Sequence, residues 1–338
     1  MPDLLTFTER GIYCAAANIY IDPWKKVNKA LITHAHSDHA RIGHKHYLAH
    51  KVTGPILKHR LGEINVQTVE YGEAIHINGV RFSFHPAGHV PGSSQIRVEH
   101  NGEVWVVSGD YKLTDDGLST PFEPLKCNTF ITECTFGLPV FKWADQENVL
   151  TGIADWWSRN REKGMASVLI AYSLGKAQRI LTNLKVREGN IYTHGAIEKM
   201  NDLFRAEGFK LPKTTLVSRE LARNVYKGSL IIAPPSAMGS SWMRKFQPYS
   251  LAIASGWMAL RGARRRRAAD RGFVLSDHAD WEGLNRAVSL TGADKIITTH
   301  GYTDIFTRWL NEKGFSATAA VTAFEGENID RETEEDEK

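Results

Sequence analysis

Apolar and polar positions alternate over much of the first 110 residues. Residues 80–84 read Val-Arg-Phe-Ser-Phe, and a short apolar run at 30–33 is followed by a polar segment. Such runs, separated by turn-forming residues, are typical of short β-strands. The stretch 94–107 contains two of them, joined through Asn101 and Gly102. This dipeptide is a strong turn signal, so the pattern predicts a β-hairpin here.

The pattern changes at about residue 141. Residues 148–161 show helical periodicity, and an apolar strand is predicted at 167–171. Further predicted strands alternate with helices up to about residue 270, after which the earlier strand pattern returns. Alternating β and α units predict a small α/β domain with a parallel sheet in this middle part of the chain.

One short stretch concentrates the metal-binding side chains. An apolar strand pattern runs into H-A-H-S-D-H at residues 34–39. Neutral imidazole and carboxylate are ligands that bind zinc. On an extended segment His34 and His36 point the same way, whereas Asp38 and His39 are expected where the chain turns into a helix and face a second point. The stretch could therefore serve two neighbouring metal ions, and the simpler alternative is a His-rich surface loop.

Six candidate functional residues share one position in the predicted pattern. Each follows a short apolar strand, mostly beside a glycine, and loops at strand ends are where a rigid scaffold presents catalytic groups. They are His34, His89, Asp110, Glu133, His278 and His300. This recurrence favours a metal site over a surface loop, although Glu133 alone would more often be a structural carboxylate.

Composition indicates a globular cytoplasmic protein. The 338 residues allow one large domain or two ordinary ones. We expect no membrane span, because no apolar run reaches about 18 residues, and the first ten residues show no signal-peptide pattern. The 3 cysteines form no C-x-x-C pair, which favours a reducing compartment. Among them Cys134 is interpreted as a buried structural thiol.

The net charge conceals an asymmetry. The whole chain carries +4, but residues 325–338 hold eight acidic and two basic side chains, so the rest of the chain carries +10. A basic body favours a polyanionic partner. The acidic tail at 326–338 has almost no apolar residues and is predicted to be disordered.

At these residues the chain resembles the metallo-β-lactamase superfamily. The resemblance rests on Asp22 in I-D-P-W, on the H-A-H-S-D-H cluster, on His89 in A-G-H-V-P-G-S, and on Asp110 in S-G-D-Y. It implies an α/β fold in which an αββα sandwich is built from residues 1–140 and 271–325.

Within that superfamily the chain resembles the β-CASP nucleases. The markers are Glu133 in T-E-C-T-F-G, His278 in S-D-H-A-D, His300 in T-H-G-Y, and the helix opening S-L-G-K-A-Q at 173–178. This resemblance implies an α/β β-CASP domain inserted at 141–270. The compact length, R-G-A-R-R-R-R and V-L-S-D-H-A-D-W look most like the bacterial ligase-associated DNA exonucleases.

The resemblance also implies two Zn²⁺ ions, with Mn²⁺ as a candidate working metal because similar ligands serve both. The implied ligands are His34, His36 and His89 for the first ion, Asp38, His39 and His300 for the second, and Asp110 as a bridge. Asp22 would accept a hydrogen bond from a ligand histidine.

The implied chemistry is hydrolysis of a phosphodiester. Zinc lowers the pKa of bound water towards about 7, so a metal-activated hydroxide would attack the phosphorus. His278 binds no metal in this scheme and would act as general acid for the leaving alkoxide, with Glu133 holding its ring.

The resemblance makes a DNA exonuclease in DNA repair the favoured function, with a DNA ligase and a helicase as pathway partners. Glu133 and His300 are instead the residues found in RNA-processing members such as ribonuclease J and the pre-mRNA 3′-end endonuclease, so RNA is the alternative substrate. Two further alternatives remain. The inserted domain argues against a small-molecule metallohydrolase acting on thioesters or lactones, and the complete ligand set argues against an inactive scaffold.

Weaker features are candidate substrate contacts. The residues are Lys176, Arg179, Ser236, Ser240, Arg264 and Arg265. The first two begin a helix whose N-terminus could receive a phosphate, or they lie on a plain surface helix. The serines belong to a turn-rich loop that could cradle a terminal phosphate or be only a linker. The arginines belong to a run of four that could contact the phosphate backbone or form a solvated face.

Overall fold

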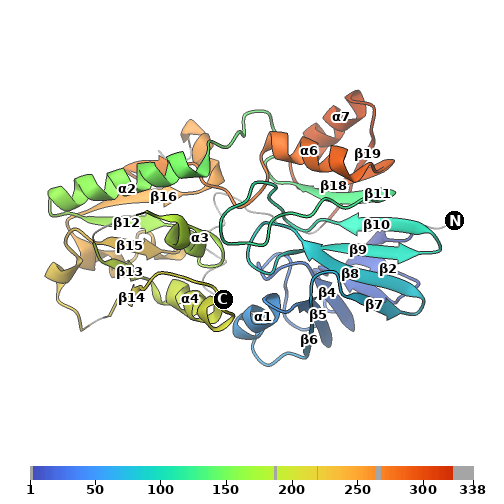
Figure 1. Ribbon diagram of the computed structural model, residues 1–338, viewed down its shortest axis with the longest axis horizontal. Coiled ribbons are helices and arrows are strands. Elements are labelled where there is room, and N and C mark those ends of the chain that lie inside the picture. The colour runs from blue at the N-terminus through green and yellow to red at the C-terminus, as the bar shows by residue number, and fades with distance from the viewer. Residues whose placement is uncertain (1–2, 186–188, 219, 263–267, 323–338) are drawn as a thin grey trace. The chain divides into compact units, whose positions relative to one another are not determined.

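The computed structural model describes residues 3–322 except 186–188, 219 and 263–267. The chain divides into two compact units, of which the first contains the described residues 3–142 and 278–322 and the second contains residues 143–277 (Figure 1). The expected disordered tail at 326–338 and the arginine run at 264–267 lie outside the described residues. None of the helices in the described ranges has the length and apolar character that a membrane crossing requires.

The first unit contains two β-sheets. The six strands of the first sheet, in spatial order, are β1 (Thr6–Thr8), β2 (Gly11–Cys14), β3 (Ile19–Ile21), β4 (Lys29–Ile32), β5 (His46–His50) and β6 (Val66–Val69). The pairs β1–β2 and β2–β3 are antiparallel, and the three following pairs are parallel. Helix α1 (Thr53–Leu61) connects the parallel neighbours β5 and β6.

The second sheet of this unit has seven strands in the order β19-β18-β11-β10-β9-β8-β7. They are β7 (Ala74–Ile77), β8 (Val80–Pro86), β9 (Ser94–His100), β10 (Glu103–Val107), β11 (Thr129–Cys134), β18 (Lys295–Gly301) and β19 (Ser316–Ala319). The predicted hairpin is confirmed, because β9 and β10 pair antiparallel. Its turn residues Asn101 and Gly102 have φ values of 50° and 81°, as a type I′ turn requires.

The two sheets pack against each other through one buried apolar cluster. Leu31 and Leu48 from the first sheet share this cluster with Trp105 and Val107 of β10. The intervening Val106 points to the opposite face, as the two-residue period of a strand requires. On that face it joins a second cluster with helices α6 (Trp281–Thr291) and α7 (Thr303–Glu312) (Figure 1).

The second unit is built on one six-stranded sheet in the order β14-β13-β15-β12-β16-β17. Its strands are β12 (Ala166–Ile170), β13 (Ile191–Thr193), β14 (Thr215–Leu216), β15 (Leu230–Ala233), β16 (Tyr249–Ala254) and β17 (Arg271–Phe273). All five strand pairs are parallel, which confirms the parallel sheet predicted for this part of the chain.

Helices pack on this sheet and connect its strands. They are α2 (Gln146–Glu162), α3 (Lys176–Asn183) and α4 (Gly195–Ala206), together with the short 3₁₀ helices at Arg223–Tyr226, Pro235–Ala237, Ser241–Phe246 and Gly256–Ala259. Leu150 and Trp157 of α2 lie in one buried cluster with Leu169 of β12 and Ile232 of β15. Because parallel strands all end at the same edge, the loops that follow them gather there.

Candidate metal centre

Asp110 lies between two sets of imidazoles in the first unit. It follows β10, is only 4% exposed, and comes directly after Gly109. Its Oδ2 lies 3.4 Å from Nε2 of His34 and 3.9 Å from Nε2 of His89. Its Oδ1 lies 3.3 Å from Nε2 of His39. The two oxygens of one carboxylate therefore face two different groups of side chains.

The first group consists of His34, His36, His89 and Asp110, whose ligand atoms all lie within 4.8 Å of one another. His34 and His36 come from the segment after β4, whereas His89 comes from the loop between β8 and β9. Nε2 of His89 lies 3.0 Å from Nδ1 of His36. Segments far apart in the sequence thus deliver three imidazoles and one carboxylate to a single point.

The second group consists of Asp38, His39 and His300, again within 4.8 Å of one another. Nε2 of His39 lies 3.6 Å from Oδ2 of Asp38. The rings of His39 and His300 stack with centroids 4.9 Å apart and planes 8° apart. His300 is part of β18, so this group joins the H-A-H-S-D-H segment to the second sheet.

The helix expected to begin near Asp38 does not form. The amides of His39 and Ala40 both donate to the carbonyl of His36, at 3.3 and 2.9 Å, which closes a single turn. The chain then leaves the helical path because the amide of Lys45 donates to the carbonyl of Val27 at 3.1 Å. This turn nevertheless places Asp38 and His39 in a group separate from that of His34 and His36.

Asp22 orients His39, and Thr33 orients Asp22. Nδ1 of His39 lies 2.8 Å from Oδ2 of Asp22, which is 1% exposed. The backbone amide and the hydroxyl of Thr33 donate to the two oxygens of Asp22, at 2.8 and 2.6 Å. Because the carboxylate accepts these bonds, Nδ1 of His39 carries a proton, and in the neutral imidazole Nε2 would present its lone pair to the second group.

Burial and charge set the protonation of these side chains. Burial and the neighbouring His39 hold the pKa of His34 well below 6.5. Burial lowers the pKa of His39, but Asp110 and Asp38 outweigh this effect and hold it well above 6.5. Burial raises the pKa of Asp110, but His39 and His278 outweigh it and hold it well below 3.8. A metal ion would therefore meet an ionised Asp110 and a neutral His34, and would displace a proton from His39.

The residues present fit a metal centre. Among the described residues, Nε2 of His34 and Oδ1 of Asp110 are buried and make no hydrogen bond. Leaving a buried polar atom unsatisfied costs about 1–3 kcal/mol. A cation in the first group would satisfy Nε2 of His34, and a cation in the second group would satisfy Oδ1 of Asp110. Imidazole nitrogens and carboxylate oxygens are the donors that zinc and related divalent ions take. The cluster could therefore hold metal ions.

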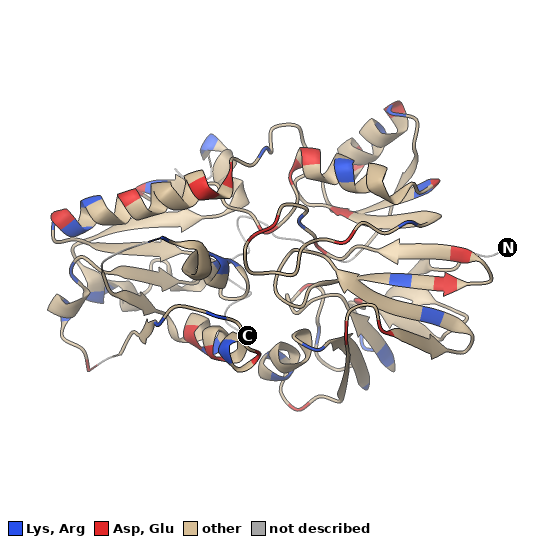
Figure 2. Ribbon diagram, in the orientation of Figure 1, with Lys and Arg blue, Asp and Glu red and all other residues tan. Residues whose placement is uncertain are grey.

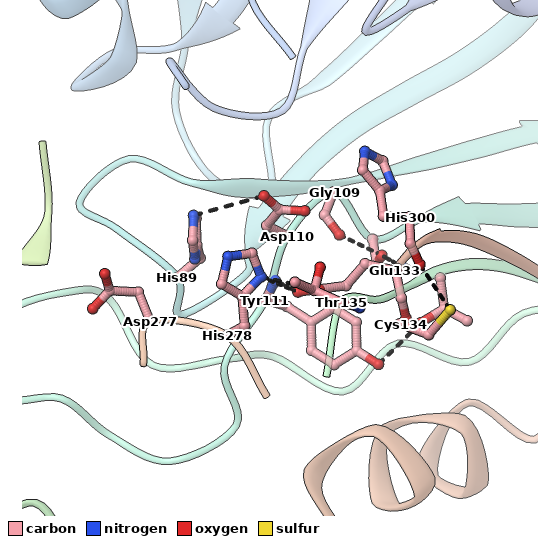
Figure 3. A network of polar contacts seen from close by, with 12 residues as sticks. His89, Gly109, Asp110, Tyr111, Glu133, Cys134, Thr135, Asp277, His278 and His300 are labelled. Carbon is pink, nitrogen blue, oxygen red and sulfur yellow. Dashed lines mark hydrogen bonds and ion pairs between the residues drawn. The ribbon is translucent and has the colours of Figure 1, made fainter. Parts of the chain in front are cut away.

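A third group contains Asp110, Glu133 and His278. Nδ1 of His278 lies 2.9 Å from Oε1 and 3.0 Å from Oε2 of Glu133. The backbone amides of Tyr111 and Thr135 donate to the same carboxylate, at 2.9 and 3.3 Å. Glu133 therefore acts as acceptor, Nδ1 of His278 carries a proton, and the His278 ring lies 4.6 Å from that of His89 (Figure 3). Both supporting donors are backbone amides, which no side-chain motif could have indicated.

The candidate substrate residues of the second unit lie in different surroundings. Lys176 and Arg179 are 0% and 2% exposed, and both face Asp277, at 3.4 and 2.9 Å. The plain surface helix considered for them is therefore wrong, and a phosphate would have to compete with Asp277. Ser236 is half-buried, whereas Ser240 is exposed and donates to the carbonyl of Ala237 at 2.7 Å.

Charge alone does not single out a binding face. Arg264 and Arg265 lie outside the described residues. Lys and Arg residues occur on both units, interspersed with Asp and Glu (Figure 2).

No family model matches the chain, but individual proteins do. A "Probable DNA ligase" of Opitutus terrae is 29% identical over 313 residues, which are 91% of this chain and 30% of that protein. Endoribonuclease YSH1 of Yarrowia lipolytica is 30% identical over 145 residues, 40% of this chain and 17% of that protein. RNase aCSPSF2 of Saccharolobus solfataricus is 31% identical over 126 residues, 36% of this chain and 25% of that protein. The chain spans less than a third of each relative.

A solved structure shares the fold. The crystal structure of a protein of unknown function from Enterococcus faecalis V583 superposes with a TM-score of 0.61 over 88% of this chain and 80% of that one, at 11% identity. At this identity the likeness concerns the fold alone. The sequence relatives, rather than this structure, indicate the kind of protein to which the chain is related. The chain is a homologue of the β-CASP nucleases of the metallo-β-lactamase superfamily.

Proposed function

We propose that the chain is a metal-dependent nuclease that hydrolyses phosphodiester bonds in nucleic acid. The observation that carries the proposal is Asp110, whose two oxygens face His34 and His39 from two ligand groups. Relatives named as endoribonucleases and as an RNase support it. So does the net charge of +10 before the acidic tail, because a basic protein attracts a polyanionic substrate.

We propose that the first unit is an αββα metallo-β-lactamase sandwich and the second unit an inserted β-CASP domain. Two sheets share one core in the first unit, and helices α6 and α7 cover the outer face of the second sheet. The chain leaves this unit after residue 142 and returns to it at residue 278. The boundaries expected from the sequence, at 140 and 271, stay predictions.

We propose two Zn²⁺ ions as the resident metals, with Mn²⁺ as the alternative. One ion would take His34, His36 and His89, the other would take Asp38, His39 and His300, and Asp110 would bridge them. When bound, such a pair supplies Lewis acidity to the attacking and leaving oxygens of the phosphodiester. The hydrogen bond from His39 to Asp22 would hold that imidazole in its ligand orientation.

The protein's own contribution to bond cleavage would come from His278. Its Nδ1 bonds to Glu133, so only Nε2 remains to exchange a proton with a substrate. Glu133 stabilises the imidazolium form, because its buried carboxylate accepts the hydrogen bond that Nδ1–H donates. A protonated His278 would then give its Nε2 proton to the departing alkoxide.

We propose DNA as the substrate and exonucleolytic repair as the setting. The relative that aligns with 91% of this chain is named a DNA ligase, which supports a link to DNA repair. A ligase, a helicase and a cytoplasmic location stay predictions. RNA is the second candidate, favoured by the names of the other relatives and by the presence of Glu133 and His300. A small-molecule metallohydrolase is the lesser alternative.

The proposal is tested by end-labelled digestion. Matched DNA and RNA strands, labelled at the 5′ or the 3′ end, are incubated with the protein and Zn²⁺ or Mn²⁺, alongside Asp110→Ala. Stepwise shortening of DNA by the wild type alone, with RNA intact, would support a DNA exonuclease, and the label released first would give its polarity. Preferential cleavage of RNA would favour the second candidate. If neither DNA nor RNA is cleaved, the nuclease proposal is contradicted, and small esters become the next substrates to test.

A further inference from the structure

We propose that Cys134 is a positioning residue that holds His300 in the geometry required by the second ligand group. This inference rests on the proposed metal centre. His300 has a φ of +54°, which lies in the left-handed region of backbone conformation. Residues other than Gly rarely adopt this conformation. Such a conformation persists only where surrounding contacts impose it.

The strand pairing explains why His300 leaves the regular ladder. β11 and β18 run parallel and in register as far as the pair Glu133 and Thr299, but the next pair is Cys134 and Gly301. His300 is therefore the extra residue of a β-bulge. Bulges re-aim one side chain and recur beside active sites. Here the bulge turns the imidazole towards His39, on which it stacks.

The thiol of Cys134 bonds to the backbone of this bulge from the neighbouring strand. Sγ lies 2.9 Å from the carbonyl oxygen of His300 and 3.3 Å from that of Thr299, so one S–H is shared between both (Figure 3). The carbonyl of Cys134 accepts a bond from the amide of Tyr302 at 3.1 Å. Cys134 is 0% exposed, so water does not compete for these carbonyls.

Close packing after His300 prevents the backbone from moving away. Gly301 has a φ of +71°, and a Cβ at this position would lie 2.4 Å from Cα of Thr135 and 2.5 Å from the carbonyl oxygen of Cys134. Only glycine fits so close an approach. The bulge is therefore held on one side by the Cys134 thiol and on the other by contact with residues 134 and 135.

The ring of His300 is oriented by the same segment. Its Nδ1 lies 3.0 Å from Oγ1 of Thr299, and that hydroxyl donates to the carbonyl of Thr132 at 3.2 Å. The hydroxyl therefore accepts from Nδ1, which leaves Nε2 to face the second ligand group. Loss of the Cys134 thiol would release the backbone under this ring. The first group should be spared, because none of its residues belongs to β11 or β18.

Metal titration of the full chain tests the proposal. Apo protein is titrated with Zn²⁺ against a chromophoric chelator, and with Co²⁺ while visible absorption reports coordination geometry. Cys134→Ala should lower the affinity for the second Zn²⁺ ion about 10-fold, within the usual range for a residue that supports a metal ligand. The affinity for the first ion should be unchanged. The Co²⁺ spectrum should differ from that of the wild type. Cys134→Ser keeps a donor and should recover most of the affinity. The control is Cys14→Ala, which removes an equally buried thiol from β2 and should bind as the wild type.

Two further variants keep the proposal open to refutation. In a His300→Ala background, Cys134→Ala should weaken metal binding no further, because it acts through that residue. Thr299→Val, which removes the hydroxyl that His300 contacts, should reproduce the selective loss if Cys134→Ala does not fold. The inference would be overturned if Cys134→Ala bound the second ion with unchanged affinity and gave an unchanged Co²⁺ spectrum. It would also be overturned if the variant lost affinity equally for both ions. Fewer than two ions on the wild type would overturn the proposed centre as well.

Discussion

Nδ1 of His278 lies 2.9 Å from Oε1 of Glu133, and each residue is 1% exposed. The amides of Tyr111 and Thr135 donate to the same carboxylate (Figure 3). Because these amides can only donate, the direction of the histidine bond is fixed, and a single nitrogen of His278 is left to meet a substrate. His278 thus lies beside the candidate ligand His89, with its Nδ1 bonded to Glu133.

His278→Ala should therefore impair turnover without removing metal. Loss of a general acid lowers the rate by about 10²- to 10⁴-fold, whereas the ligand groups around Asp110 remain intact. Turnover on the preferred nucleic acid and metal content per chain measure the two effects. A p-nitrophenyl phosphodiester serves as control, since its leaving group needs no proton and its hydrolysis should fall much less. Near-wild-type turnover on nucleic acid would rule out the acid role.

Asp110→Ala should remove metal as well as activity. One carboxylate faces both His34 and His39, so both ligand groups lose a donor together. Elemental analysis of the purified variant should find well under half of the wild-type metal content. The matched control is Asp116→Ala, which removes another buried aspartate of the same unit, one whose carboxylate accepts bonds from the amides of residues 118 and 119. If Asp110→Ala kept a full metal complement, the bridging role would be wrong.

Arg179→Met should destabilise the second unit. It would leave Asp277 without the guanidinium 2.9 Å away and would break the bond to the carbonyl of Ser276 at 2.6 Å. Removing one partner of a buried ion pair costs up to about 3–5 kcal/mol, and Lys176, which lies 3.4 Å from Asp277, should offset part of this loss. Urea denaturation measures the loss, and Glu147→Gln, which breaks the exposed pair with Lys185, should leave the midpoint unchanged. Equal midpoints for Arg179→Met and the wild type would contradict this role.

His44 should make the fold less stable in mild acid. Burial lowers its pKa to about 4, from 6.5 in the unfolded chain, and Nδ1 accepts a bond from the amide of Val27 at 3.3 Å. Between these values the unfolded chain binds the proton and the folded chain does not. Stability present above pH 6.5 is therefore lost as the pH falls towards 4, by at most about 3 kcal/mol.

His44→Asn keeps an acceptor near Nδ1 and cannot titrate, so it isolates this effect. Urea denaturation at pH 7 and pH 5 should show a smaller loss of stability in the variant than in the wild type. Identical pH dependence of the two proteins would show that His44 does not couple protonation to folding.

Local sequence signals predicted much of the fold. The hairpin around Asn101 and Gly102 formed because the alternation and its turn dipeptide are contained within 14 residues. The parallel sheet of the second unit followed from the alternation of strands and helices. The helix expected at Asp38 was wrong, because the pairing of Lys45 with Val27 overrides the local tendency.

Sequence patterns could not predict the contacts between residues that lie far apart in the chain. The sequence pattern suggested that Lys176 and Arg179 lie at a helix N-terminus that could bind phosphate or on a surface helix. In the structure both side chains are buried and form ion pairs with Asp277, about 100 residues later in the chain. The ligand residues stood out because their types are chemically distinctive. Their supports, such as Thr33 on Asp22 and Cys134 behind His300, are ordinary residues whose roles depend on backbone geometry.

Two metal ions bridged by Asp110 are proposed to make this protein a nuclease. The most direct measurement titrates metal-free protein with Zn²⁺ or Mn²⁺ and follows bound metal and release of labelled nucleotide in the same samples, with Asp110→Ala in parallel. Hydrolysis of DNA or RNA should rise as the second ion binds and should be absent in the variant. Two bound ions without hydrolysis of either nucleic acid, or equal hydrolysis by Asp110→Ala, would contradict the proposal.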